Sequence, residues 1–253
     1  MSDVIFEVAD GIATITINRP EVRNAVNAAV ALAIADATDQ IDQRDDIQAA
    51  ILTGAGGAFS AGMDLKAFLR GENVKPHGRG FAGLTDARIR KPLIAAVEGP
   101  ALAGGFEMAL ACDLIVASET SKFGLPEVKR GLVANAGGLV RLPRQLPYQL
   151  ALELVLTGDT ISAQELLAHG LINRVAPAGQ VLAVARQLAA TIAANGPMAV
   201  AASKRVMQAS QDWPSTELFE RQNEYTLPVF KSADAKEGAT AFAEKRKPVW
   251  TGA

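Results

Sequence analysis

The chain has 253 residues, with 25 Lys and Arg against 27 Asp and Glu, so its formal net charge is −2. This balance excludes the cationic excess that draws proteins onto nucleic acids. One cysteine and two histidines leave no cluster for a metal ion, so no metal is expected. No apolar run reaches the roughly 18 residues of a membrane span, and no signal peptide is recognisable. We therefore expect a soluble, cytoplasmic globular protein without nucleic-acid or membrane partners.

The first elements are predicted to be a β-hairpin and a helix. Alternating apolar residues from Val4 to Val8 predict one strand, and the β-branched stretch Ile12–Ile17 predicts the next. Asp10-Gly11 supplies a tight turn between them. Apolar residues at helical spacing follow as far as Ile41, and Asn24 is the predicted N-cap of that helix.

Strands and helices alternate in the next hundred residues. Residues 47–52 and 93–97 predict short buried strands, residues 106–112 a helix and residues 113–117 another strand. This alternation predicts an α/β fold with crossover connections. The polar, glycine-rich stretch 71–83 predicts a mobile loop or lid.

The last third of the chain is almost continuously helix-forming from Gln180 onward. Asp234 with Glu237 predicts a capping box for a final helix that reaches Lys245. We place a boundary near Asn195, between an α/β core of residues 1–195 and a helical C-terminal unit of residues 196–253.

Two strand-to-helix turns, at residues 59–65 and 101–107, place glycine where a helix begins. Such a helix start leaves backbone N–H groups unpaired and electropositive, and glycine lets another backbone approach closely. Two of these turns facing each other would form an oxyanion hole. The alternative is two ordinary turns in which glycine relieves strain, and spacing alone favours that alternative.

Two carboxylates favour a catalytic site over two ordinary turns. Glu107 lies in an otherwise apolar helix, where a buried carboxyl would have a raised pKa. Glu127 follows after Phe123-Gly124-Leu125-Pro126. Either acid alone is more often solvated or salt-bridged. Together, beside a glycine-built donor pair, they indicate acid/base chemistry at the α and β carbons of a carbonyl compound.

Motifs along nearly the whole chain resemble the crotonase (enoyl-CoA hydratase/isomerase) superfamily. In chain order they are INRPEVRNAVN at 17–27, FSAGMDLK at 59–66, the glycine turn and helix around 101–118, FGLPEVKRGL at 123–132, AGG at 136–138, LTGD at 156–159 and FAEKRKPVW at 242–250. The resemblance implies a ββα spiral core with a C-terminal helical oligomerisation unit. It also implies a homotrimer or a dimer of trimers, and no cofactor, because CoA is part of the substrate.

The resemblance further implies site residues and a reaction. The backbone N–H groups of Met63 and Gly104 would form the oxyanion hole for the thioester oxygen. Glu107 and Glu127 match both acids of enoyl-CoA hydratases, whereas isomerases typically keep only the second. The implied reaction is syn addition of water to a 2-enoyl-CoA, giving a 3-hydroxyacyl-CoA through an enolate. Glu107 would deprotonate the water that attacks the β carbon, and Glu127 would protonate the α carbon.

Two alternatives stay open beside the hydratase. One is isomerisation or dehydration of a specialised acyl-CoA, since this scaffold hosts several reactions. The other is a non-catalytic protein that binds acyl-CoA, although such a protein would need neither acid.

Further residues are expected to contact the acyl-CoA thioester. The candidates are Ala61, Asp64, Leu65, Lys66, Arg23, Asn135 and Phe81, with Lys245 as a weaker one. Two positions depart from the hydratase pattern. Ala134-Asn135 stand where hydratases often have Pro-Gly, which bears on where the water sits, and Pro100 replaces a residue that is often larger. Both departures leave room for an unusual acyl chain.

Overall fold

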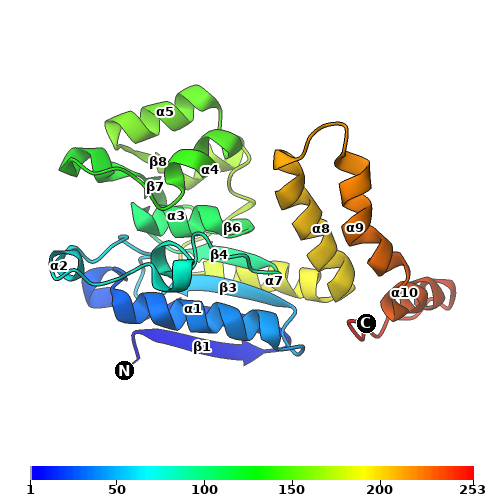
Figure 1. The fold of residues 1–253 in the computed structure, drawn as a ribbon. Helices are drawn as coiled ribbons and strands as arrows, with labels where there is room; N and C mark the ends of the chain where they lie inside the picture. Colours follow the sequence, from blue (N-terminus) through cyan, green and yellow to red (C-terminus); the bar gives the residue numbers. More distant parts are fainter. Residues whose placement is uncertain (1) are drawn as a thin grey trace.

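Parallel strands make up most of the central sheet in the computed structural model, which describes residues 2–253 (Figure 1). Its six strands have the order β1-β2-β3-β4-β6-β9. β1 (Val4–Ala9) pairs antiparallel with β2 (Ile12–Ile17) through the predicted Asp10-Gly11 turn, where both residues have positive φ. The remaining neighbours are parallel: β3 (Ala49–Gly54), β4 (Leu93–Val97), β6 (Leu114–Ser118) and β9 (Arg174–Ala176).

A smaller sheet lies over the central one and gives the chain its spiral course. Its strands have the order β5-β7-β8, with β5 (Ala101–Leu102) parallel to β7 (Lys122–Gly124) and β7 antiparallel to β8 (Thr160–Ser162). One turn of the spiral is a strand in each sheet followed by a helix, as in β4, β5 and α3 (Gly104–Ala111). The α/β class and the ββα spiral are therefore as predicted.

The remaining helical elements surround the sheets or extend beyond them. The α-helices are α1 (Ala28–Gln43), α2 (Leu65–Leu69), α4 (Gly138–Gln145), α5 (Tyr148–Thr157), α6 (Ala163–Ala168), α7 (Val181–Ala193), α8 (Pro197–Ala209), α9 (Leu218–Phe230) and α10 (Ala233–Ala243). The 3-10 turns are η1 (Pro20–Val22), η2 (Pro76–Gly78), η3 (Phe81–Gly83), η4 (Pro126–Arg130) and η5 (Ser210–Asp212).

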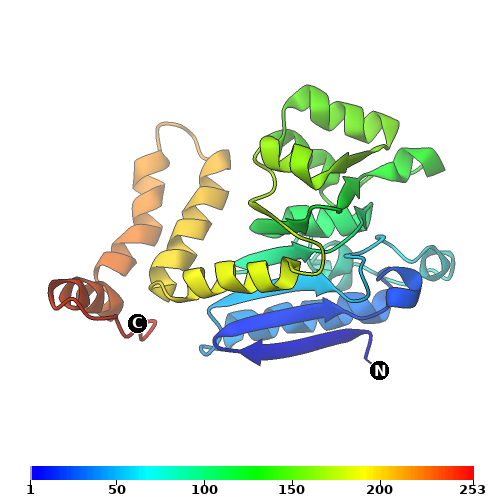
Figure 2. The ribbon, with the colours of Figure 1, turned by 180° about the vertical axis from the view of Figure 1, so that it is seen from behind.

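Apolar side chains cover both faces of the central sheet. Ile15 of β2 and Ile34 of α1 belong to the cluster on one face, while Ile51, Val116 and Ala185 belong to the cluster under α7. Figure 2 shows α7, in yellow, running along the sheet. Burial on both faces explains why the parallel strands are short continuous apolar runs rather than alternating ones.

Three boundaries differ from the predictions by at most two residues: β3 begins at Ala49, α3 at Gly104 and β6 at Leu114. The lid prediction is wrong for its second half. Phe81 and Ala82 are buried, and Arg79 binds Asp39 and Thr38 of α1 with two contacts of 2.6 Å.

The predicted N-cap of the first long helix is wrong. Asn27 is the cap of α1, and its side chain accepts a hydrogen bond from the N–H of Val30 at 2.9 Å. Asn24 is buried with φ 56°, and its amide donates to the carbonyls of Ala55 and Ala58 at 2.8 and 2.7 Å. Asn24 therefore ties the loop after β3 to the chain before α1, because buried carbonyls need donors.

The predicted capping box of the last helix is wrong as well. Ser232 caps α10 by accepting a hydrogen bond from Ala235, and the helix ends at Ala243. Asp234 is buried in the first turn, where its carboxylate accepts from the N–H groups of Thr251 and Gly252. Asp234 therefore holds the C-terminal tail.

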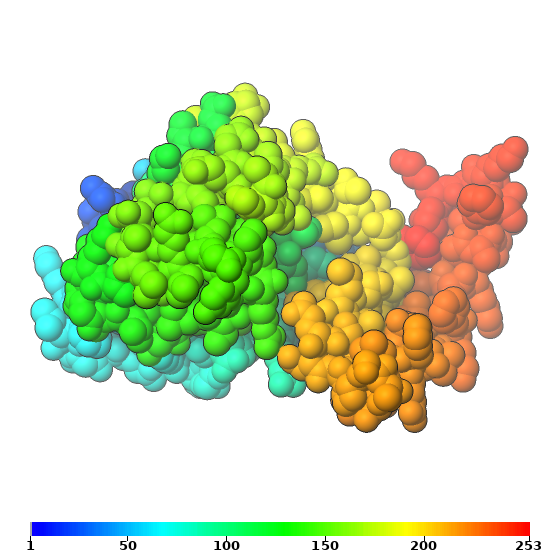
Figure 3. All heavy atoms as spheres, turned by 90° about the horizontal axis from the view of Figure 1, so that it is seen from above, coloured from blue at the N-terminus to red at the C-terminus, as the bar shows by residue number. Residues whose placement is uncertain are grey.

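The C-terminal residues that contain α8–α10, coloured yellow-orange to red, project to one side of the rest of the molecule (Figure 3). The predicted boundary at residue 195 falls in the turn between α7 and α8, and the role of residues 196–253 in oligomerisation stays a prediction. Polar contacts join α8 to the core: Lys204 donates to Asp113 at 2.6 Å and to the carbonyl of Lys91 at 2.8 Å, and Gln208 donates to Asp113 at 2.9 Å. None of the helices within residues 2–253 combines the length and apolar character needed to cross a bilayer.

We predict that Lys204→Met lowers the free energy of unfolding by about 2 kcal/mol, because it leaves the Asp113 carboxylate largely buried without its cation. The two side chains are only 12% and 17% exposed. Urea unfolding measures the change. Lys129→Met is the matched control, since its pair with Asp159 is exposed and should contribute less than about 1 kcal/mol. Equal effects of the two variants would contradict the prediction.

Candidate active site

Two glycine turns meet at the centre of the molecule. Ser60 and Ala101 form a parallel β-bridge, and the N–H of Leu102 donates to the Ser60 carbonyl at 3.0 Å. A Cβ added to Gly62 would lie 2.8 Å from the nitrogen of Gly104. These contacts leave no room for side chains at the crossing, so the two turns approach each other closely.

The approach brings two free backbone donors together. Gly104 is the first residue of α3, and Met63 directly follows Gly62. Neither N–H donates to an acceptor anywhere in residues 2–253. Ala103, the N-cap of α3, has φ 51° and ψ −129°, a strained conformation for a residue with a Cβ. The N–H of Ala103 is held by the Gly124 carbonyl at 2.9 Å, and this fixes the direction of the next N–H.

Met63 is held in place from both of its neighbours. The N–H of Val26 donates to the carbonyl of Gly62 at 2.8 Å, and the N–H of Asp64 donates to the carbonyl of Val26 at 2.9 Å. The carboxylate of Asp64 caps α2 by accepting from the N–H groups of Lys66 and Ala67. The chain around the Met63 donor therefore forms a rigid strand-to-helix corner.

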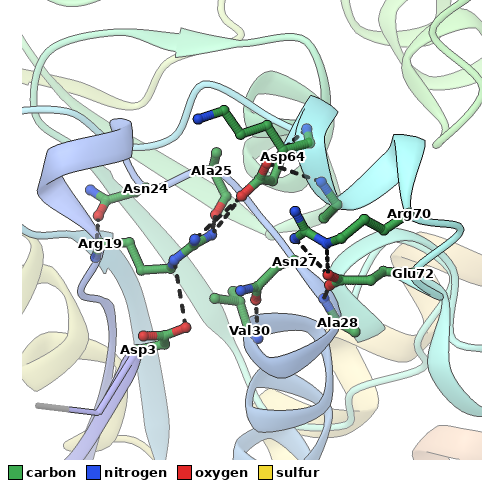
Figure 4. A network of polar contacts seen from close by, with 12 residues as sticks. Asp3, Arg19, Asn24, Ala25, Asn27, Ala28, Val30, Asp64, Arg70 and Glu72 are labelled. Atoms are coloured by element: carbon green, nitrogen blue, oxygen red, sulfur yellow. Dashed lines mark hydrogen bonds and ion pairs between the residues drawn. The ribbon is translucent and has the colours of Figure 1, made fainter.

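Arg19 completes this corner, as Figure 4 shows. Its guanidinium donates to the Asp64 carboxylate at 3.3 Å and to the Ala25 carbonyl at 2.6 Å, and it lies 3.5 Å from Asp3. Burial opposes ionisation of Asp64, but the N–H of Ala67 and the Arg19 guanidinium outweigh it, so the pKa of this carboxyl is lowered. Arg19 was not among the predicted site residues, although INRPEVRNAVN contains it.

Glu107 is buried in α3, as its apolar surroundings predicted. Its Oε1 accepts hydrogen bonds from the N–H groups of Ala136 and Gly138, at 2.7 and 2.9 Å. Burial raises the pKa of Glu107, while these two N–H groups and the charges of Arg141 and Lys75 oppose the rise. The carboxylate thus has built-in partners for its ionised form.

Glu127 lies in η4 in a different environment. Its Oε2 is buried and has no hydrogen-bond partner in residues 2–253. Burial, reinforced by the negative charge of Glu107, raises its pKa to about 7. At neutral pH, one acid of the pair is therefore suited to accept a proton and the other to donate one.

The departures from the hydratase pattern leave these contacts intact. Ala136 and Gly138 supply the donors to Glu107 even though Ala134-Asn135 precede them, since only backbone N–H groups are used. The carbonyl of Pro100 accepts from the N–H groups of Phe59 and Ser60, so Pro100 anchors the first glycine turn.

The predicted binding residues from the first half of the chain lie beside the Met63 corner. The N–H of Ala61 donates to the carbonyl of Arg23 at 2.9 Å, and the Arg23 side chain is exposed. Leu65 and Lys66 are exposed on α2. The carboxylate of Asp64 is taken up by the cap and by Arg19, so any contact of Asp64 with a ligand would use its backbone.

Phe81 and Asn135 line a cavity of about 390 Å³. The ring of Phe81 lies against Gly104, where an added Cβ would come within 2.5 Å of it. Lys75 and Arg141 also line this cavity and were not predicted. Gly137, at φ +109°, leaves the space that Nη1 of Arg141 occupies.

The weaker candidate, Lys245, does not join the site within one chain. It follows α10, which lies at the opposite end of the molecule from α2 in Figures 1 and 2. No group of three His, Cys, Asp or Glu side chains in residues 2–253 is arranged to hold a metal ion.

Comparisons with known proteins agree with this geometry. Enoyl-CoA hydratase EchA19 of Mycobacterium tuberculosis is 46% identical over 245 residues, covering 92% of this chain and 91% of the relative. Carnitinyl-CoA dehydratase of Salmonella enteritidis is 41% identical over the full length of both chains. The crystal structure of enoyl-CoA hydratase EchA1 from Mycobacterium marinum superposes with a TM-score of 0.98, at 56% identity and full coverage of both chains.

A family model matches as well. Residues 7–253 fit the model described as enoyl-CoA hydratase/isomerase, which covers nearly the whole chain. The resemblance drawn from the motifs is confirmed: the chain belongs to the enoyl-CoA hydratase/isomerase family.

Proposed function

We propose that this protein is an enoyl-CoA hydratase that adds water to a 2-enoyl-CoA and forms a 3-hydroxyacyl-CoA. The observation that carries the proposal is the pair of acids beside two unpaired N–H groups: Glu107 has two backbone donors, and Glu127 has a buried Oε2 with no partner. The hydratases among the relatives support the same reaction. No resident cofactor is required, because CoA arrives with the substrate.

The thioester oxygen binds between the N–H groups of Met63 and Gly104. Their donors, with the positive end of the α3 dipole, stabilise the negative charge that develops as the carbonyl becomes an enolate. Withdrawal of electrons toward this oxygen makes the β carbon electrophilic. The binding energy is greatest in the transition state, so the donors accelerate the chemical step.

The two acids then move protons on one face of the substrate, which makes the addition syn. Glu107 takes a proton from water as the water oxygen bonds to the β carbon, and protonated Glu127 delivers its proton to the α carbon. The proton on Glu107 returns to Glu127, directly or through solvent, before the next turnover. Dehydration of a 3-hydroxyacyl-CoA follows the same path backward.

That reversibility defines the second candidate function. A relative named carnitinyl-CoA dehydratase matches the full chain, so a dehydratase of a specialised acyl-CoA is the nearest alternative. An isomerase is disfavoured by the presence of Glu107, because isomerases typically keep an acid only at the position of Glu127. A simple acyl-CoA-binding protein needs neither Glu107 nor Glu127.

The CoA portion is proposed to lie along the Met63 corner. Ala61, the backbone of Asp64, and Leu65 surround the exit from the oxyanion hole, while Lys66 and Arg23 present exposed cations to the phosphates. Local contacts of this kind suit a chain whose formal net charge is only −2.

Oligomerisation through residues 196–253 is also part of the proposal, as a homotrimer or a dimer of trimers. Large apolar side chains on these helices are uncovered in a single chain: Phe219 is 80% exposed, Phe230 78% and Phe242 86%. Apolar surface of this extent typically marks a protein interface, and copies of the same chain are its usual partners.

Replacing either acid is predicted to abolish most activity. We expect Glu107→Gln and Glu127→Gln each to lower kcat for crotonyl-CoA hydration by about 10²–10⁴-fold, and the double variant to lose little more, because both act in one step. The loss of enoyl absorbance reports the rate. Glu119→Gln, at an exposed glutamate, serves as the control. Near-normal hydration by both active-site variants would contradict the mechanism.

The pH profile of kcat/KM is predicted to be bell-shaped, because the active form carries one proton on the pair. Activity should fall above pH of about 7 as Glu127 loses its proton, since the pKa of Glu127 is raised to about 7. It should fall at acidic pH as Glu107 gains one. Hydration consumes no net proton, so dehydration must show the same profile. The residual activity of Glu127→Gln should lack this fall at alkaline pH. If the fall is unchanged in that variant, its cause is the titration of another group.

Arg19 is predicted to act as a positioning residue for the Met63 donor. Arg19→Met should lower kcat about tenfold, or roughly 1.4 kcal/mol of transition-state stabilisation, with a smaller change in KM. A bound 4-dimethylaminocinnamoyl-CoA should lose part of its red shift, which reports polarisation of the thioester carbonyl. Arg44→Met, in an exposed ion pair, is the control. A full red shift in Arg19→Met would show that Arg19 affects stability only.

A further inference from the structure

The cavity of about 390 Å³ begins at the proposed reaction centre. Ala136, whose N–H donates to Glu107, lines it, and so does Phe81, whose ring lies against Gly104. None of its lining residues comes from the 61–66 segment, beside which we place CoA. The cavity is therefore positioned to receive the end of the acyl chain that is remote from the thioester.

Polar side chains without protein partners line this cavity, and three of them, Lys75, Asn135 and Asp86, are exposed. The Nζ of Lys75, the amide of Asn135 and the carboxylate of Asp86 make no hydrogen bond or ion pair with any other residue in 2–253. The hydroxyl of Thr85 makes no hydrogen bond there either, and it keeps contact with solvent. An unbranched alkyl chain would displace water from these groups without replacing the hydrogen bonds that the water makes to them.

The charges on the lining have a net positive sum. Among the lining residues, Lys75 and Arg141 contribute two positive charges and Asp86 contributes one negative charge. The carboxylate of Glu107 lies at the reaction-centre end, where the N–H groups of Ala136 and Gly138 hold it. Arg141 is fixed in position, because its Nη2 donates to the Thr85 carbonyl at 2.5 Å. A fixed guanidinium and a nearby ammonium make a favourable site for a carboxylate, with the guanidinium supplying paired donors.

We propose that the preferred substrate is a 2-enoyl-CoA whose acyl chain ends in a carboxylate, bound between Lys75 and Arg141 with Asn135 as a further donor. This inference rests on the proposed function and specifies its substrate class. A chain that ends in a trimethylammonium group is disfavoured, because it adds a positive charge beside Lys75 and Arg141. The polar cavity thereby favours a hydratase of dicarboxylic acyl thioesters over a dehydratase of quaternary-ammonium acyl thioesters.

Three six-carbon 2-enoyl-CoA thioesters test the proposal, with a methyl, a carboxylate or a trimethylammonium group at the far end. For the full-length protein, we expect kcat/KM to be at least tenfold higher for the carboxylate than for the methyl compound, and lowest for trimethylammonium. Lys75→Met should reduce this preference about tenfold, and Asp86→Asn should increase it. Lys129→Met, at an exposed lysine outside the cavity, is the matched control.

Binding gives a second readout that does not depend on turnover. Calorimetry should show adipoyl-CoA binding at least tenfold more tightly than hexanoyl-CoA, with the difference lost in Lys75→Met. Equal kcat/KM and equal Kd across the end groups would overturn the proposal. So would an equal loss for all thioesters in Lys75→Met, which would show that Lys75 acts on Glu107 or on CoA and not on the end group. Failure to hydrate any of the thioesters, crotonyl-CoA included, would instead contradict the proposed function, and the binding preference would still decide the substrate class.

Discussion

The close approach of two backbone turns is the constraint on which the site depends. Gly62 meets Gly104, and Gly105 meets the carbonyl of Ser60, where an added Cβ would lie only 2.2 Å away. This contact places two unpaired N–H groups side by side and aims the start of α3 at the same point. Ala103 has a strained backbone conformation in this arrangement. Two contacts hold the turns in place: the bridge between Ser60 and Ala101, and the ion pair between Arg19 and Asp64.

The two acids differ through what surrounds them rather than through their chemistry. Glu107 is more deeply buried than Glu127 but has two backbone donors, so its ionised form has partners inside the protein. Glu127 has a buried oxygen with no partner and a pKa raised to about 7. An unpaired buried carboxyl destabilises the fold, and such a group persists where it serves a reaction.

The same short segments serve binding and structure together. The AGG stretch supplies donors to Glu107 with its backbone, leaves space for Arg141 at Gly137 and lines the acyl cavity. Phe81 packs against the oxyanion turn and also lines that cavity. Changes in the cavity therefore act on the base through Arg141 and Lys75, whose charges favour ionised Glu107. In the proposed mechanism, the charges that would select the substrate also act electrostatically on Glu107.

The sequence by itself determined most of the elements and predicted the candidate reacting groups. Period-two and helical patterns predicted the hairpin and the alternating strands and helices. Glycine at two helix starts, with Glu107 in an apolar helix, indicated acid/base chemistry beside an oxyanion hole. Each of these is a local signal, so the sequence alone contains it. Only the tertiary structure decided that Asn24 and Asp234 bind distant backbone, that Arg19 fixes the Met63 corner, and that Lys75, Asp86 and Arg141 share one cavity. Those contacts join residues far apart in the chain, so their partners depend on how the sheets and helices pack, which no local pattern contains.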